Sequence, residues 1–189
     1  HNLKEIINGL VALIDDPNIS IDGLMEHVKG PDFPTAGLIM GMDGLKQAYE
    51  TGRGKIKMRA RAHIETNKNG KDSIVITEVP FQTNKANLVE KIADLVGQKK
   101  IEGIRDLRDE SDKDGIRVVV ETKKDVVPEV ILNQLYQFTQ LQDTFGIILL
   151  ALVEGVPKVM SLKTTLQHFV DFRHDVVVRR TEFELKEAE

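Results

Sequence analysis

Positively charged side chains alternate with apolar ones between residues 55 and 64. The cations on one side of the pattern are Lys55, Lys57, Arg59, Arg61 and His63, and the apolar residues on the other are Ile56, Met58, Ala60, Ala62 and Ile64. This period of two predicts one half-buried strand with a cationic outer face. Residues two apart on such a strand project about 7 Å apart. This is close to the spacing of phosphates along one DNA strand, so the face could hold a nucleic-acid backbone.

Arg53 lies just upstream of this strand, between Gly52 and Gly54, and glycines allow a phosphate to approach the backbone closely. Contacts of this kind position DNA without reading its sequence. The alternative is an ordinary solvated strand face whose charges pair with nearby acids such as Glu78.

An acidic segment, residues 110–121, nearly matches a calcium-binding EF-hand loop, with oxygen-bearing side chains at the expected spacing and Gly115 at the sixth position. It departs from that motif at the first position, which is Glu110, and at the usually apolar eighth position, which is Arg117. Its flanks also have the pattern of strands instead of helices. We therefore expect a hairpin turn in which glycine supplies a positive φ, and no metal site.

No nucleophile motif stands out in the sequence. It has no cysteine, no G-x-S-x-G, no Walker loop and no H-E-x-x-H. Tyr49 and Tyr136, the two tyrosines, fall near the apolar stripes of expected helices and are predicted to pack in the core. The residues alone indicate a binding scaffold without catalytic residues.

The composition of the 189 residues is that of a globular protein, and the net charge of −4 excludes a chain that is basic all over. Any contact with nucleic acid must therefore come from a local patch. The longest apolar run, residues 145–153, is about half of the roughly 18 residues that a membrane span needs, and no signal peptide is evident. We expect a soluble segment excised from a longer protein.

The elements that would position the cationic strand alternate between helices and hairpins. Asn2 and Ser20 are expected to cap two helices, and Gly52 to end a third. Residues 73–79 complete a hairpin with the cationic strand, and residues 104–107 and 116–121 form another. Thr83 or Asn84 is expected to cap another helix, and Asp125 and Pro128 to open the next. The run from residue 145 is predicted to be a buried strand that turns at residues 154–155 and continues to 160. The predicted fold class is α+β.

The last helix is expected to start at the cap Ser161 and run to the end of the chain. Its apolar residues are spaced close to heptads: Leu162, Leu166, Phe169, Val176 and Phe183. A helix of this length seldom folds back on a small domain, which predicts an arm.

The amino-acid sequence resembles, nearly end to end, the A subunit of bacterial DNA gyrase in the type IIA topoisomerase family. The resemblance is to the part of that subunit that follows its catalytic winged-helix region. The matching stretches are HNL at 1–3, GPDFPT at 30–35, AYETGRG at 48–54, VPFQ at 79–82, NKA at 84–86, KKIEGI at 99–104, LRDESD at 107–112, TQLQ at 139–142 and RRT at 179–181.

The resemblance implies an α+β tower domain over residues 1–160, beside the bent gate-segment DNA, and the start of a coiled-coil arm over residues 161–189. The family's catalytic tyrosine lies before His1, so the fragment is expected to be inactive. The parent enzyme would supercoil double-stranded DNA negatively in the cytoplasm. It would be a heterotetramer of two A and two B subunits, with ATP and Mg²⁺ held by the gyrase B subunit.

In this context the candidate DNA-binding residues are Arg53, Lys55, Lys57, Arg59, Arg61 and Lys85. Two alternatives remain. One is the homologous subunit of topoisomerase IV, and the other is an architectural spacer that makes no DNA contact. The isolated fragment is expected to be a monomer in dilute solution.

Overall fold

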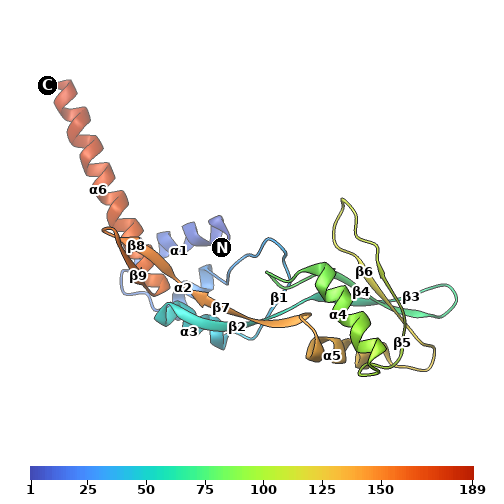
Figure 1. Cartoon of the computed structure of the whole chain (residues 1–189). Coiled ribbons are helices and arrows are strands. Elements are labelled where there is room, and N and C mark those ends of the chain that lie inside the picture. The colour runs from blue at the N-terminus through green and yellow to red at the C-terminus, as the bar shows by residue number, and fades with distance from the viewer. The chain divides into compact units, whose positions relative to one another are not determined.

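The computed structural model describes all 189 residues and confirms the α+β class, with antiparallel sheets, six helices and a long C-terminal helix (Figure 1). The chain divides into two compact units. Unit 1 comprises His1–Asp32, Met42–Ile56 and Gly146–Glu189, and unit 2 comprises Phe33–Gly41 and Lys57–Phe145. The predicted division into residues 1–160 and 161–189 remains a prediction.

Three short helices of unit 1 begin or end where the sequence predicts. Helix α1 (Leu3–Asp15) starts at Asn2, whose side chain accepts the N–H groups of two first-turn residues, and α2 (Ile21–His27) starts at Ser20 in the same way. Helix α3 (Asp43–Thr51) ends at Gly52, which has a left-handed φ of 80°. Local capping chemistry therefore sets these boundaries.

The long helix α6 (Leu162–Ala188) starts at Ser161, whose hydroxyl accepts the N–H of Thr164. Only Leu162 and Leu166 are buried, and they lie where α1 and α3 pack against its first turns. Most of the remaining apolar side chains of α6, such as Phe183, are exposed, and Val170 and Val176 are partly buried. None of the six helices has the length and hydropathy that crossing a membrane requires.

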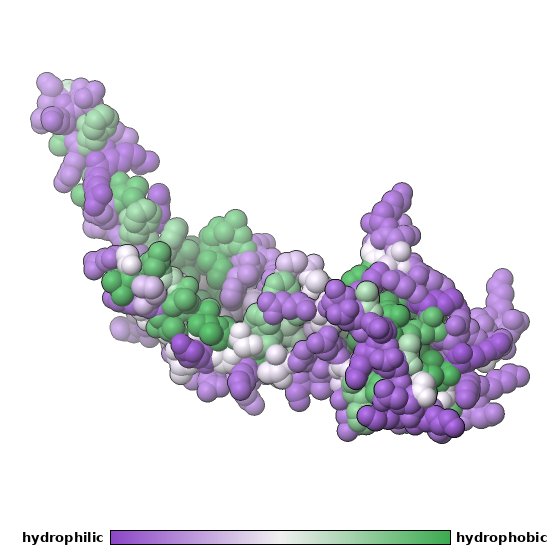
Figure 2. All heavy atoms as spheres, viewed as in Figure 1, coloured by the Kyte–Doolittle hydropathy of each residue, from purple (hydrophilic) through white to green (hydrophobic).

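Strands β8 (Leu150–Val153) and β9 (Val156–Val159) form the expected hairpin, turned at Glu154 and Gly155 with positive φ at both. The prediction of a buried strand here was wrong. Leu150 and Leu152 are 60 % and 71 % exposed. They lie two residues apart on one face of a two-stranded hairpin, and this face has no covering layer in the structure. Figure 2 shows apolar side chains gathered at the surface over this hairpin and α1.

Unit 2 contains a four-stranded antiparallel sheet in the order β3-β4-β6-β5. Its strands are β3 (Arg61–Thr66), β4 (Asp72–Glu78), β5 (Ile104–Asp109) and β6 (Val118–Thr122). Both predicted hairpins, β3–β4 and β5–β6, are confirmed. Helices α4 (Lys85–Gly97), capped by Asn84, and α5 (Pro128–Phe138), with proline in its first turn, contribute to the same core.

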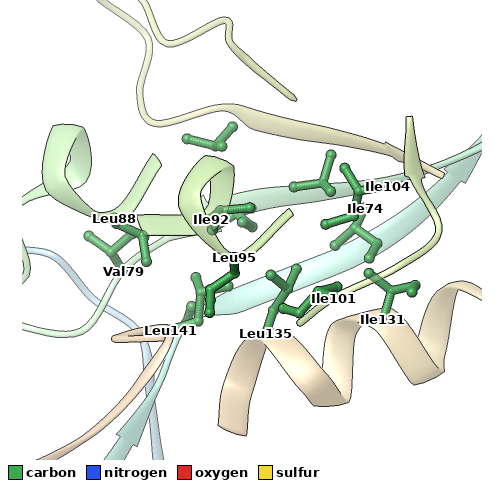
Figure 3. Close-up of a cluster of buried hydrophobic side chains, with 14 residues drawn as sticks. Ile74, Val79, Leu88, Ile92, Leu95, Ile101, Ile104, Ile131, Leu135 and Leu141 are labelled. Atoms are coloured by element: carbon green, nitrogen blue, oxygen red, sulfur yellow. The ribbon is translucent and has the colours of Figure 1, made fainter. Parts of the chain in front are cut away.

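That core joins alternate residues of the sheet to one stripe of each helix (Figure 3). Ile74 of β4 lies among Ile92 and Leu95 of α4 and Ile131 and Leu135 of α5, all at most 3 % exposed. The segments between the elements add Val79, Ile101 and Leu141. Burial of these side chains supplies most of the driving force for folding unit 2.

The single strand predicted for residues 55–64 is two strands. Strand β2 (Arg53–Arg59) belongs to a three-stranded sheet in the order β1-β2-β7, with β1 (Leu38–Met40) and β7 (Gln142–Ile148), whereas β3 belongs to the four-stranded sheet. The break is at Ala60, whose N–H donates to the carbonyl of Leu141. The predicted alternation persists on both sides of the break: Ile56, Met58 and Ala60 are buried, and Ala62 and Ile64 of β3 are partly buried.

Candidate nucleic-acid interface

Arg53 and Lys55 lie on the exposed face of β2 in unit 1. They border a groove of about 440 Å³ lined by Gln47, Arg53, Gly54, Lys55, Gly146, Ile147 and Ile148. The ion pairs of unit 1 join other residues, such as Lys46 with Asp22. These two cations are therefore available to an anion from outside.

Close backbone packing of α3 fixes the position of this part of β2. A Cβ added at Gly44 of α3 would overlap the carbonyl oxygen of Lys55, and one added at Gly54 would overlap the carbonyl oxygen of Gly44. The hydroxyl of Thr51 also donates to the Arg53 carbonyl, at 2.8 Å, and accepts the Arg53 N–H, at 3.2 Å. Glycine and threonine thus hold the strand that presents the cations.

Lys57 and Arg59, which belong to unit 2, differ although they are two residues apart on one strand. The side chain of Lys57 is exposed, and Lys57 lies opposite Met40 of β1 in the antiparallel pairing of the two strands. The half-buried guanidinium of Arg59 donates two hydrogen bonds to Oε1 of Gln142, at 2.9 and 2.6 Å, and lies 4.5 Å from the ring centroid of Tyr136. Arg59 therefore joins three elements of the fold.

Two other predicted contact residues are paired with acids. Arg61 lies 3.1 Å from Glu78, which also accepts the N–H of Gly37 at 2.8 Å. Burial opposes ionisation of Glu78, but the Gly37 N–H and Arg61 outweigh it and lower the pKa of this carboxyl. Lys85 lies 2.7 Å from Asp109. Hydrogen bonds, first from Lys85 and then from Ser111, lower the pKa of Asp109 to about 2.

The acidic segment that resembles an EF-hand loop is a hairpin turn with a positive φ at Gly115. Two arginines, Arg108 and Arg117, bind the carboxylate of Glu110 at 3.1 and 3.3 Å. Arg108 also contacts Glu121 at 3.2 Å. These charges form an ion-pair network over the strands β5 and β6.

Tyr49 is fully buried in unit 1, as predicted, and its hydroxyl lies 2.7 Å from Nε2 of His1. Burial, helped by Glu5, raises the pKa of Tyr49, which keeps the phenol protonated. Tyr136 is half-buried, and its hydroxyl donates to the carbonyl of Ala60 at 3.4 Å. Both tyrosines therefore have structural partners within the fold.

Of the six predicted contact residues, the structure leaves Arg53, Lys55 and Lys57 unpaired within their units and engages Arg59, Arg61 and Lys85. DNA contact by any of them remains a prediction. Sequence reasoning missed Gln142, because no local pattern links it to Arg59, and Gly146, a glycine inside β7. For Gly146, the one available signal was that a glycine interrupts an apolar run in the sequence.

These features define an α+β scaffold with an exposed cationic strand and a long terminal helix, and comparison with known proteins identifies the class. All of residues 1–189 match the family model for the A subunit of DNA gyrase/topoisomerase IV, and the chain belongs to this family. Over its whole length it is 60 % identical to the DNA gyrase A subunit of Clostridium acetobutylicum and 58 % identical to that of Escherichia coli K12. It spans 23 % and 22 % of these relatives.

Proposed function

We propose that the chain is an internal part of the DNA breakage-reunion subunit of a bacterial DNA gyrase, where it supports the gate-segment duplex through phosphate contacts. Similarity to gyrase A subunits over the whole of this chain supports the first part of this proposal. The second part rests on one observation: Arg53, Lys55 and Lys57 are exposed along β2 without an acidic partner in their units.

We infer the remaining features of the parent enzyme from the same family membership. The parent would supercoil DNA negatively by ATP-dependent passage of one duplex through another, as a cytoplasmic heterotetramer with the gyrase B subunit, which would hold ATP and Mg²⁺. This chain would form the tower domain beside the DNA. The exposed apolar side chains of α6, including Phe169, Phe172 and Phe183, support a role as the start of the coiled-coil arm.

We infer that the DNA-contacting set is Arg53, Lys55 and Lys57, because the other three predicted residues have partners within the fold. Releasing Arg61 or Lys85 to a phosphate would leave Glu78 or Asp109 without its cation. Releasing Arg59 would break two hydrogen bonds and its contact with Tyr136. Exposed lysines and arginines can instead exchange counterions for phosphates with little rearrangement.

The test is duplex binding by the complete subunit carrying Lys55→Ala and Lys57→Ala, measured by fluorescence anisotropy over a series of salt concentrations. Each lost phosphate contact lowers the slope of log K against log salt by about 0.9, so the double variant should lose about 2 from the slope together with affinity. The matched control is Lys68→Ala, which removes an exposed lysine from the β3–β4 loop.

An unchanged affinity with an unchanged salt slope would reject DNA contact and leave the architectural spacer. That alternative has support in the net charge of −4 and in the internal pairing of Arg61 and Lys85. Arg59→Ala tests whether Arg59 stabilises the fold, in contrast to the exposed cations Lys55 and Lys57. It should lower the free energy of unfolding by about 1–3 kcal/mol, because it removes hydrogen bonds to a charged group.

A further inference from the structure

Gly146 has no structural requirement for glycine within its unit. It lies inside β7, where glycine weakens a strand relative to alanine. Its φ is not positive, and a Cβ added there would meet no atom within 4 Å. By contrast, packing requires glycine at Gly44 and Gly54, and a left-handed backbone favours it at Gly52. A glycine inside a strand often marks a bulge, a tight bend, or close approach by a ligand or another backbone.

The hydrogen bonding of β7 to its neighbour places Gly146 beside the cations of β2. The N–H of Leu149 donates to the carbonyl of Gly52 at 2.8 Å. At the other ends of β2 and β7, the N–H of Ala60 donates to the carbonyl of Leu141, so the two strands are antiparallel. Counting inward from either hydrogen bond places Ile148 opposite Arg53 and Gly146 opposite Lys55. Opposed residues on a sheet share a face. The groove lining contains all four of Arg53, Lys55, Gly146 and Ile148.

We propose that Gly146 forms the floor of a subsite for the sugar-phosphate backbone of DNA. The missing side chain lets a phosphodiester approach the β7 backbone, where Lys55 and Arg53 pair with that phosphate and its neighbour. Ile148, which is 55 % exposed beside Arg53, packs against the deoxyribose. This subsite rests on the proposed function and deepens it, because it assigns recognition to shape as well as to charge.

The experiment places side chains in the groove without removing any charge. Gly146→Ala and Gly146→Val are introduced into the complete subunit, and binding of a fluorescein-labelled duplex is measured across a salt series. The variants should bind more weakly, valine more than alanine, and the valine variant should lose between about 1 and 2 from the salt slope as one or both phosphate contacts are lost. Urea unfolding should show no loss of stability for Gly146→Ala, because open space surrounds the added methyl.

The matched control is Gly97→Ala. Gly97 is exposed at the end of α4, has no positive φ, and likewise has no atom within 4 Å of an added Cβ. This control should leave binding and salt slope unchanged.

The outcomes separate the subsite from the proposed function. If the lysine variants weaken binding while Gly146→Val keeps both affinity and slope, the subsite is rejected and DNA contact by β2 stands. If neither set of variants changes binding, the proposed function fails as well. A loss of stability in Gly146→Ala that matches its loss of binding would show that the glycine serves the fold, and this too overturns the subsite.

Discussion

Glu65 is held between Arg117 and His63 on the outer side of the four-stranded sheet. Arg117 donates to its two carboxylate oxygens at 3.1 and 2.8 Å, and Nε2 of His63 lies 2.9 Å from one of them. Hydrogen bonds from Arg117 and then His63 lower the pKa of Glu65 from 4.5 to about 2. These contacts join β3 to the segment before β6, which are far apart in the sequence.

Replacing Glu65 by glutamine should change how stability depends on pH. Because the pKa is lower in the folded state, the ionised carboxylate favours folding above about pH 4.5, and this contribution is lost as the pH falls through about 2. The Glu65→Gln variant should therefore be less stable than the unsubstituted chain at pH 7, and its free energy of unfolding should fall less between pH 4.5 and 2. Urea unfolding at a series of pH values measures both effects.

Glu90→Gln is the control for this prediction, because Glu90 is exposed on α4 and takes part in none of the ion pairs of unit 2. Its pH profile should follow that of the parent. Identical profiles for Glu65→Gln and the parent would show that the ion pair with Arg117 adds nothing to folding.

The candidate site could be predicted from sequence only as far as local alternation reaches. Alternation correctly predicted that Lys55 and Lys57 are exposed. It gave Arg59 the same status, because nothing nearby in the sequence indicates Gln142, 83 residues further along, as a partner. Pairing of a cation depends on tertiary contacts, which a strand pattern does not contain.

At the scale of elements, the contact between α3 and β2 should be intolerant of any side chain at Gly44. Gly44→Ala would force its methyl against the carbonyl of Lys55. Overpacking of this kind lowers stability by about 1–3 kcal/mol. Chemical denaturation should show this loss, whereas Gly97→Ala, whose methyl has open space, should not. Equal stability of the two variants would mean that α3 shifts freely on β2.

Capping residues and hairpin patterns predicted most of the elements, because both are local. Asn2, Ser20 and Ser161 cap helices as expected, and of the two predicted caps Thr83 and Asn84 it is Asn84 that caps α4. The break at Ala60 was not predictable, because a buried alanine fits the alternation whether the strand continues or ends. At Ala60 the chain still bonds Leu141, whereas from Arg61 it pairs with β4, so the break is defined by partners distant in sequence.

At the scale of the whole molecule, helix α1 has an exposed apolar face. Its exposed residues recur about once per turn, at Leu3, Ile7, Val11 and Ile14, and are 49–74 % exposed. Soluble monomers rarely expose large contiguous apolar patches, so this face favours association.

Replacing Ile7 and Val11 by lysine should reduce concentration-dependent self-association of the chain, measured by sedimentation velocity over a concentration series. The free energy of unfolding should change by no more than about 0.5 kcal/mol, because Ile7 and Val11 are surface residues that are 49 % and 51 % exposed. The contrasting variant is Leu13→Ala, at a residue that is 1 % exposed, which should lose about 2–5 kcal/mol. If the variant with lysine at positions 7 and 11 associates as strongly as the unsubstituted chain, self-association must use another surface, such as β8.

The strand order β3-β4-β6-β5 also sets an order of folding events. The β3–β4 and β5–β6 pairings join neighbouring segments, and hairpins of this kind form in about 1–10 μs. The central β4–β6 pairing instead brings together strands separated by α4 and β5, so its larger loop-closure entropy makes it the slower event. Unit 2 should therefore assemble from two early hairpins, and its rate should depend most on the valine contacts that join Val75 to Val119 at the centre of the sheet.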